Sequence, residues 1–288
     1  MVQGLAGVSQ WAGRQVGRLG LRSGSANGRL RGDELAEAQA YHDRNGDERL
    51  LLDDSRKWEQ RDDPNFLSRP VPLPTVTSKY AGKPHDNGKP IPYLHYSLAY
   101  DADRRMAIYT VANFDRTRRS VPARGSDPFV PDPRVPADKQ WTDALYKDNP
   151  FDRGHLVGRQ DIAWGPTPAP AGRPNPSAFD EAVNVFTNAT PQYDSFNQGL
   201  WPAAEQWSRV EHNPAADRVT LFTGPVFRPD DYDYRGAKVP RSFWKVAVSD
   251  AGGKAGGLVV EAVIADQYDL RTPDKPPRRA ESAQGVHV

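Results

Sequence analysis

Two strings in the middle of the chain carry the residues with the clearest potential for chemistry. The first is Asp152-Arg153-Gly154-His155, and Asn197 follows in the string Phe196-Asn197-Gln198-Gly199. Cleavage of a phosphodiester needs a base that activates water and positive charge that stabilises the transition state and the leaving oxygen. Imidazole titrates near neutrality, so His155 can take the proton, and the amide oxygen of Asn197 can hold a hard divalent cation such as Mg²⁺. The two strings therefore predict a one-metal phosphodiesterase site.

Neighbouring polar residues could complete this site. Arg153 offers a planar cationic fork for phosphate, and Gly154 permits close backbone approach. If residues 202–210 are helical, Glu205 and Arg209 share one face, with the carboxylate near the hydrated cation and the guanidinium near phosphate. Singly, each feature has an ordinary interpretation as a capped turn, a loop or a surface ion pair worth little. Their occurrence together within one short stretch favours the site.

The elements that must position these residues follow from the pattern of apolar side chains. An apolar run, a turn and an apolar return over residues 94–113 predict a β-hairpin. Further strands are expected at 219–223, 243–248 and 257–264, and a helix at 202–210 with Pro202 at its first position. Residues 122–150 and 165–176 are loops by composition, and the 152–155 string lies at the end of the first. The pattern indicates an α+β fold with a mixed or antiparallel sheet.

With these strings in place, the sequence resembles the DNA/RNA non-specific endonuclease family, the ββα-metal or His-Me finger nucleases. The similarity covers roughly residues 79 to 270, and its central strings are highly specific. The matching strings are Asp152-Arg153-Gly154-His155-Leu156, Thr187-Asn188-Ala189-Thr190-Pro191-Gln192 and Phe196-Asn197-Gln198-Gly199-Leu200-Trp201, followed at the same spacing by Glu205 and Arg209. Weaker matches lie at 223–227 and 239–245.

The resemblance implies a role for each matching residue. His155 would be the general base, and Asn197 the one protein ligand of Mg²⁺ or Mn²⁺. Glu205 would position water, and Arg209 would stabilise the transition state or the leaving group. Three further residues would support the substrate region or meet phosphate: Asn188, Asp152 and Arg153. For the upstream active-site arginine of the family the candidate is Arg124, with Arg134 as the alternative.

The implied activity is hydrolysis of DNA and RNA to 5′-phosphate ends, without base readout because contacts are mainly to phosphate. One alternative is a nuclease toxin domain held in check by an immunity protein. Another is a non-catalytic nucleic-acid- or calcium-binding relic of this fold, against which the intact His155, Asn197 and Glu205 argue. A protein inhibitor and a homodimer stay open as partners, and no membrane association is expected.

The composition of the chain limits the folds and functions that these motifs can have. The chain has 288 residues, enough for one large domain and a smaller appendage. It has no cysteine, which excludes disulfides, thiolate metal sites and cysteine nucleophiles. A net charge of +1 argues against general attraction to nucleic acid. Six arginines and one acid between Arg104 and Arg124 could instead line a local phosphate groove, the alternative being a solvated hairpin.

The first sixty residues differ from the rest. Residues 32–42 favour a short helix, flanked by two stretches at 23–34 and 43–54 that resemble calcium loops. The candidate Ca²⁺ ligands are Asp43, Asn45, Asp47 and Asp54. Glu48 stands where a glycine is expected, so we interpret 1–60 as a helical extension with a degenerate EF-hand-like pair. A helical hairpin with polar turns is the alternative.

The domain organisation expected from these patterns has four parts. The helical extension (1–60) is followed by a proline-rich linker (61–78), the endonuclease domain (79–272) and a polar tail (273–288). Residues 1–20 are mildly apolar but interrupted by Arg14 and Arg18, so we predict no cleaved signal peptide. Localisation is left open, with export by another route as one alternative.

Overall fold

The computed structural model describes residues 62–77, 82–120, 128–166, 178–252, 256–267 and 286–287. Several sequence-based predictions lie outside these ranges: the helix at 32–42, the calcium ligands Asp43, Asn45, Asp47 and Asp54, and the candidate arginine Arg124. Among the described helices, none combines the length and apolar character that a membrane span requires.

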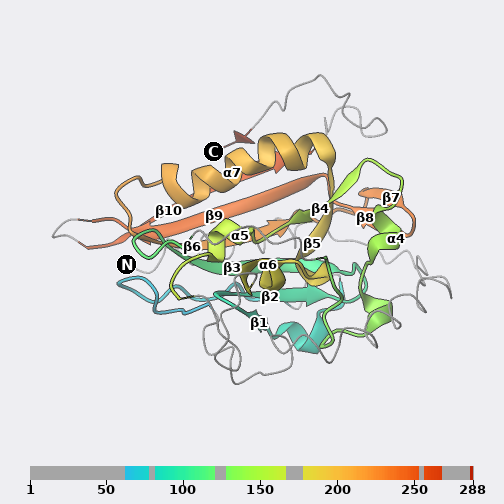
Figure 1. Cartoon of the computed structure of the whole chain (residues 1–288), viewed down its shortest axis with the longest axis horizontal. Helices are drawn as coiled ribbons and strands as arrows, with labels where there is room; N and C mark the ends of the chain where they lie inside the picture. The colour runs from blue at the N-terminus through green and yellow to red at the C-terminus, as the bar shows by residue number, and fades with distance from the viewer. Residues whose placement is uncertain are drawn as a thin grey trace.

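A seven-stranded sheet forms the centre of the described part of the chain (Figure 1). Its strand order is β1–β2–β3–β6–β9–β10–β11, and every neighbouring pair is antiparallel. The predicted α+β class is therefore confirmed, with an antiparallel sheet. The strands are β1 (Ile91–Tyr93), β2 (Tyr96–Asp101), β3 (Met106–Asp115), β6 (Arg218–Pro225), β9 (Ser242–Asp250), β10 (Leu258–Asp266) and β11 (Val286–His287).

The predicted hairpin at 94–113 is present as β2 and β3. Its turn is stabilised by the side chain of Asp101, whose Oδ1 accepts hydrogen bonds from the backbone N–H groups of Asp103 and Arg104, both at 2.8 Å. Arg105 closes the turn with a φ of 57°. An aspartate that bonds the backbone two and three residues ahead is a common way to fix a tight turn.

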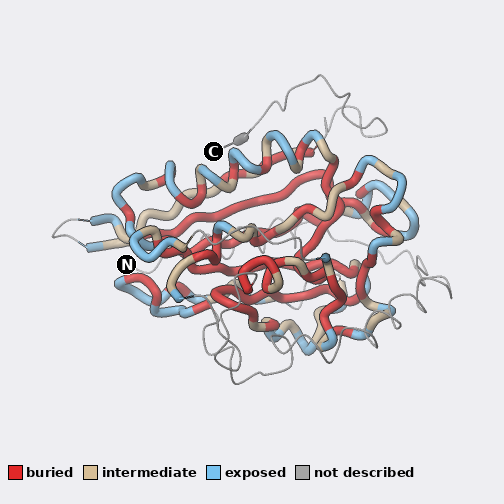
Figure 2. The backbone as a smooth tube through the Cα atoms, viewed as in Figure 1, coloured by how far each residue is buried: buried red, intermediate tan, exposed pale blue. Residues whose placement is uncertain are grey.

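Both faces of the sheet are covered, so its central strands are buried along almost their whole length (Figure 2). Alternate residues of a strand point to opposite faces. In β9, Phe243 belongs to the larger hydrophobic cluster on the face of the site, whereas Trp244 belongs to a second cluster on the other face. Phe66 and Val71 pack into this second cluster. Residues 62–77 thus cover the face opposite the site.

The segment that carries the predicted site is a separate β-hairpin followed by a helix. Strands β4 (Phe151–His155) and β5 (Ala189–Tyr193) pair in antiparallel register, and three helical pieces follow (Figure 1). These are η5 (Phe196–Leu200), α7 (Trp201–Gln206) and η6 (Trp207–Glu211), of which η5 and η6 are π-helical. The expectation that residues 152–155 end a loop is wrong, because pairing with β5 makes them strand. The helix also begins before the predicted 202–210.

Short elements complete the fold, and those between β3 and β4 lie in the stretch 122–150 that composition assigned to loops. They include α4 (Asp143–Tyr146) and η2 (Ala137–Lys139) between β3 and β4, and α5 (Arg159–Ile162), α6 (Ala178–Val183) and η4 (Phe186–Asn188) between β4 and β5. The remaining pieces are η1 (His85–Gly88) and the small hairpin of β7 (Tyr232–Tyr234) and β8 (Ala237–Val239). Helices this short carry too little periodicity to be predicted from apolar spacing.

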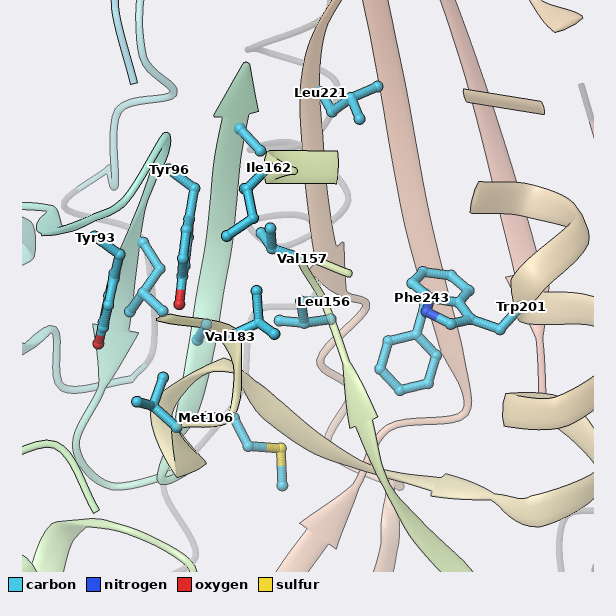
Figure 3. Packing of buried hydrophobic residues seen from close by; sticks show 14 of the residues in the cluster. Tyr93, Tyr96, Met106, Leu156, Val157, Ile162, Val183, Trp201, Leu221 and Phe243 are labelled. Atoms are coloured by element: carbon cyan, nitrogen blue, oxygen red, sulfur yellow. The ribbon is translucent and has the colours of Figure 1, made fainter. Parts of the chain in front are cut away.

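A hydrophobic cluster supports the site from below (Figure 3). Leu156 and Val157 continue β4 directly into this cluster and are at most 1% exposed. Trp201 packs against Phe243 of the sheet with ring centroids 5.5 Å apart. Burial of such large side chains stabilises a domain by about 1.5–3 kcal/mol each. The cluster therefore fixes the end of β4 and the start of α7 against the same sheet.

Candidate active site

Two hydrogen bonds join the helical segment to the first and the last residue of the 152–155 string. The indole N–H of Trp201 donates to the carbonyl oxygen of His155 at 2.9 Å. The side-chain amide of Asn197 donates to Asp152 Oδ2, also at 2.9 Å. The structure therefore brings His155 and Asn197 onto neighbouring, mutually anchored elements.

The imidazole of His155 is held by a side chain that the sequence did not reveal. Its Nε2 lies 3.0 Å from the side-chain oxygen of Asn184, and its ring centroid lies 4.9 Å from that of Phe129. A carboxamide oxygen only accepts hydrogen bonds, so this contact places the proton of the neutral ring on Nε2. The basic nitrogen is then Nδ1. Asn184 thus supplies the oriented tautomer that a general base needs.

Asn197 has the orientation that a cation ligand requires. Its Nδ2 donates to Asp152, and Gln198 Nε2 donates to the same carboxylate oxygen at 3.0 Å. With Nδ2 engaged, the amide oxygen of Asn197 is left to act as the ligand. In the part of the chain that the structure describes, no three histidine or acidic side chains gather into a metal cage. The donor set therefore fits a cation that keeps most of its water, as Mg²⁺ does.

Asn197 lies within a π-helical turn. The η5 segment follows β5 almost directly, and its π geometry continues into the regular turns of α7. π-Helices are rare, occur mostly as single turns within α-helices, and are frequent at functional sites. The turn that contains Asn197 has this geometry.

Glu205 and Arg209 belong to a buried cluster of four charges. Arg209 Nη1 lies 2.7 Å from Asp161 Oδ1 and 3.9 Å from Glu205 Oε2, and the Arg209 side chain is only 9% exposed. Lys245 of β9 is the fourth member. Burial, with a smaller contribution from Asp161, raises the pKa of Glu205 to about 6, while Lys245 and Arg209 oppose that rise. The sequence interpretation of 205 and 209 as a surface pair does not apply.

Arg153 is paired within the protein. Its guanidinium forms an ion pair with Asp143 and lies over the rings of Phe129 and Tyr146, 5.7 and 5.5 Å from their centroids. More than a third of the Arg153 side chain is exposed. It could reach a phosphate only in competition with Asp143.

The side chain of Asn188 is buried and binds two backbone segments. Its amide exchanges two hydrogen bonds of 3.0 Å with the backbone of Val157, and Nδ2 also donates to the carbonyl oxygen of Val183 at 3.0 Å. These contacts join the residues after β4 to the end of α6. Asn188 therefore fixes the backbone that follows His155.

Arg134, the alternative upstream arginine, is bound to structural partners. It makes a two-pronged contact with Asp132, donates to the carbonyl oxygen of Pro92 at 2.7 Å, and lies over the ring of Tyr93. The arginines of residues 104–119 are similarly engaged by protein groups. Arg105 lies over Trp141, and Arg118 lies over Trp164.

Sequence reasoning missed Asn184, Asp161, Asp143 and Lys245. Asn184, Asp161 and Asp143 stand in stretches that composition assigned to loops or left unassigned. Lys245 closes the weaker matching string at 239–245, so its place in that string was the available signal. Asn184, Asp161 and Lys245 contact elements distant in sequence, as in the 48-residue separation of Asp161 and Arg209. Asp143 pairs with Arg153, only 10 residues away.

Gly154 supplies a test of how closely β4 and β5 must approach. A Cβ at this position would overlap the side chain of Gln192 on β5, whereas a Cβ on Gly199 would meet nothing within 4 Å. We expect Gly154→Ala to destabilise the protein by about 1–3 kcal/mol, as overpacking of a buried site does. Thermal and urea unfolding would measure this, with Gly199→Ala as the matched control. Equal stability of the two variants would contradict the packing described here.

Comparisons with known proteins indicate the same family as the sequence resemblance. The family model for DNA/RNA non-specific endonucleases matches residues 76–288. An uncharacterised protein of Sinorhizobium fredii (strain NBRC 101917 / NGR234), y4fB, is 37% identical over 225 residues, which cover 71% of this chain and 32% of that protein. Mitochondrial endonuclease G of Bos taurus is 28% identical over 232 residues, covering 68% of this chain and 73% of that protein.

Human mitochondrial endonuclease G is 30% identical over 172 residues, covering 55% of this chain and 54% of that protein. The chain thus spans about a third of y4fB and about half of the human enzyme. Among solved structures, the EndoG/EndoGI complex contains a similar fold, with a TM-score of 0.50 and 20% identity over 65% of this chain and 77% of that chain.

Proposed function

Because the chain belongs to the DNA/RNA non-specific endonuclease family, we propose that it is a metal-dependent endonuclease that hydrolyses phosphodiester bonds of DNA and RNA. One observation carries the proposal. The imidazole of His155 is held through Nε2 by Asn184, on a strand that Trp201 and Asn197 tie to the following helix. This arrangement supports a role for His155 as an oriented general base and for the amide oxygen of Asn197 as a ligand of a hard cation.

The chain's own residues account for the proton transfer. His155 Nδ1 takes a proton from water, whose oxygen attacks phosphorus in line with the bond to the 3′ oxygen. That P–O bond breaks, so the phosphate stays on the 5′ side, and the 3′ oxygen takes up a proton from solvent water. The products are a 5′-phosphate end and a 3′-hydroxyl end. His155 then returns its proton to solvent before the next cycle.

Asn197 would hold Mg²⁺ or Mn²⁺ through its amide oxygen, while Asp152 keeps that amide in one orientation. When bound, the cation would offset charge on the phosphate and on the leaving oxygen. Glu205, in its ionised form, would accept hydrogen bonds from water in the site. Arg209 would act on Glu205, since its guanidinium is directed at Asp161 and Glu205.

Chelation tests the metal dependence. We expect EDTA to stop cleavage of both supercoiled plasmid and single-stranded RNA, because Asn197 alone cannot offset the charge of the transition state. Addition of Mg²⁺ or Mn²⁺ in excess over the chelator should restore the rate. Agarose and denaturing polyacrylamide gels would follow the two substrates. Undiminished cleavage in EDTA would rule out the metal mechanism.

Calcium binding by the N-terminal extension, a protein inhibitor and a homodimer are further proposals for this chain. The fold neighbour was solved as a complex of EndoG with EndoGI, which supports a search for an inhibitor. Calorimetry with Ca²⁺ on the full chain and on a variant with Asp43 and Asp47 changed to Asn would test the first. Light scattering would give the oligomeric state, and co-purification from the native cell would reveal an inhibitor.

A further inference from the structure

Lys245 is a buried ammonium group with no part in the steps described above. It is 1% exposed, in the middle of β9. Its Nζ donates to Thr223 Oγ1 at 2.9 Å and lies 4.9 Å from the centre of the Trp201 ring. A charged ammonium is costly to bury unless negative charge compensates it. Burial lowers the pKa of Lys245, and neighbouring anions oppose this decrease.

Those anions are Asp161 and Glu205. Both attract the ammonium of Lys245, whereas Arg209 repels it. Asp161 is 1% exposed and is held at both oxygens: Oδ1 by Arg209 at 2.7 Å, and Oδ2 by the backbone N–H of Gly158 at 2.8 Å. The cluster thus contains two anions and two cations, and it has no net charge when all four are ionised.

Glu205 is the member of the cluster closest to water, with 18% of its side chain exposed. The charged groups that face its carboxylate are Asp161 from α5, Arg209 from η6 and Lys245 from β9. On its remaining side it packs close to Gly158, where a Cβ would lie 3.1 Å from Glu205 Oε1. The carboxylate is therefore held between α5, the helix and the sheet.

We propose that Lys245 and Asp161 are positioning residues for hydrolysis, which together set the charge and the orientation of the Glu205 carboxylate. This inference rests on the proposed nuclease function. Lys245 also lies on the ring of Trp201, whose indole N–H holds the carbonyl oxygen of His155. One ammonium thereby supports both the carboxylate and the strand end that carries the base.

The charge balance predicts that loss of the Lys245 charge and loss of the Asp161 charge shift the pKa of Glu205 in opposite directions. Burial already raises the pKa of Glu205 to about 6. Loss of the Lys245 charge raises this pKa further, so that Glu205 becomes protonated at neutral pH and no longer accepts hydrogen bonds from water. Loss of the Asp161 charge lowers the pKa of Glu205. Loss of both restores a neutral cluster of Glu205 and Arg209.

Three variants test the proposal: Lys245→Met, Asp161→Asn and the double variant. Partners that orient a catalytic group typically contribute about ten- to a hundredfold. We expect each single variant to lower kcat by that factor with little change in KM. In side-chain ¹³C NMR of the metal-free protein, the Glu205 carboxyl, assigned with Glu205→Gln, should titrate at higher pH in Lys245→Met and at lower pH in Asp161→Asn. The double variant should recover much of the lost kcat.

Lys238→Met, which changes a half-buried lysine on β8 that pairs with Asp233, is the matched control and should keep the wild-type kcat. Circular dichroism would confirm that each variant is folded. If Lys245→Met does not fold, the downward shift in Asp161→Asn still decides the matter. Titration shifts in the same direction, or additive losses in the double variant, would overturn the proposal. If the wild-type chain does not cleave nucleic acid, the proposed function is wrong. The opposite NMR shifts of the Glu205 carboxyl test the charge cluster independently of cleavage.

Discussion

Replacement of His155 by alanine is expected to lower kcat for plasmid cleavage by about a hundred- to ten-thousandfold, the usual contribution of a general base. Binding of nucleic acid should persist, because phosphate contacts made by other residues provide most of the affinity. Alanine removes the nitrogen that we propose takes the proton from water, and it also removes the contact with Asn184. Gel assays of nicking would measure the rate, and fluorescence anisotropy of a labelled oligonucleotide would measure the binding.

His85→Ala is the matched control, since His85 lies in η1, distant in sequence from the 152–155 string, and is not buried. It should cleave at the wild-type rate. A His155→Ala variant with wild-type turnover would remove the assigned base. A variant that loses binding and turnover together would show that His155 acts on substrate affinity instead.

The second large effect is expected from Asn197→Ala. This change removes the amide oxygen assigned to the cation, and it also frees Asp152 from one of its two amide donors. We expect the Mg²⁺ concentration for half-maximal activity to rise at least about tenfold, with a lower maximal rate. Titration of the cleavage rate with Mg²⁺ at fixed substrate would measure both quantities.

Gln198→Ala provides a close control for Asn197→Ala. Gln198 donates to the same oxygen of Asp152, at 3.0 Å, but is assigned no bond to the cation. Its loss should change the Mg²⁺ requirement much less than the loss of Asn197. Equal changes in the two variants would mean that Asn197 acts only by holding Asp152.

The sheet could be predicted from the sequence because its strands are apolar and bounded by turn residues. The hairpin of β2 and β3 is an example, since Asp101 and the residues after it form a turn from local interactions alone. Strand β4 could not be predicted in this way. Aspartate and glycine are poor strand formers, and pairing with β5 holds them in an extended conformation.

The site was predictable to the extent that its residues belong to short strings. His155 and Asn197 lie in such strings, and the structure places them on elements joined by Asp152 and Trp201. Asn184, Asp161 and Lys245 could not be found in the same way. Their roles arise from contacts between α5, α6, the helix and the sheet, and no local pattern encodes a contact of that kind.

The helix that follows β5 shows the same limit. Pro202 correctly indicated that a helix is present in this region, but the helical segment begins at Phe196 and includes Asn197. This first turn is hard to recognise in the sequence, because it contains Gly199, a poor helix former, and has π-helical geometry. Asn197, the proposed metal ligand, therefore lies on a helical segment anchored to β4 and not on a loop.

End analysis of the cleavage products tests the central claim most directly. Purified chain would be incubated with supercoiled plasmid and single-stranded RNA in Mg²⁺, and the new ends would be examined by ligation and by mass spectrometry. We predict that both substrates are cut at internal positions and that the fragments carry 5′-phosphates and 3′-hydroxyls. Intact substrates after incubation with folded protein in Mg²⁺ or Mn²⁺, or fragments with 3′-phosphates, would contradict it.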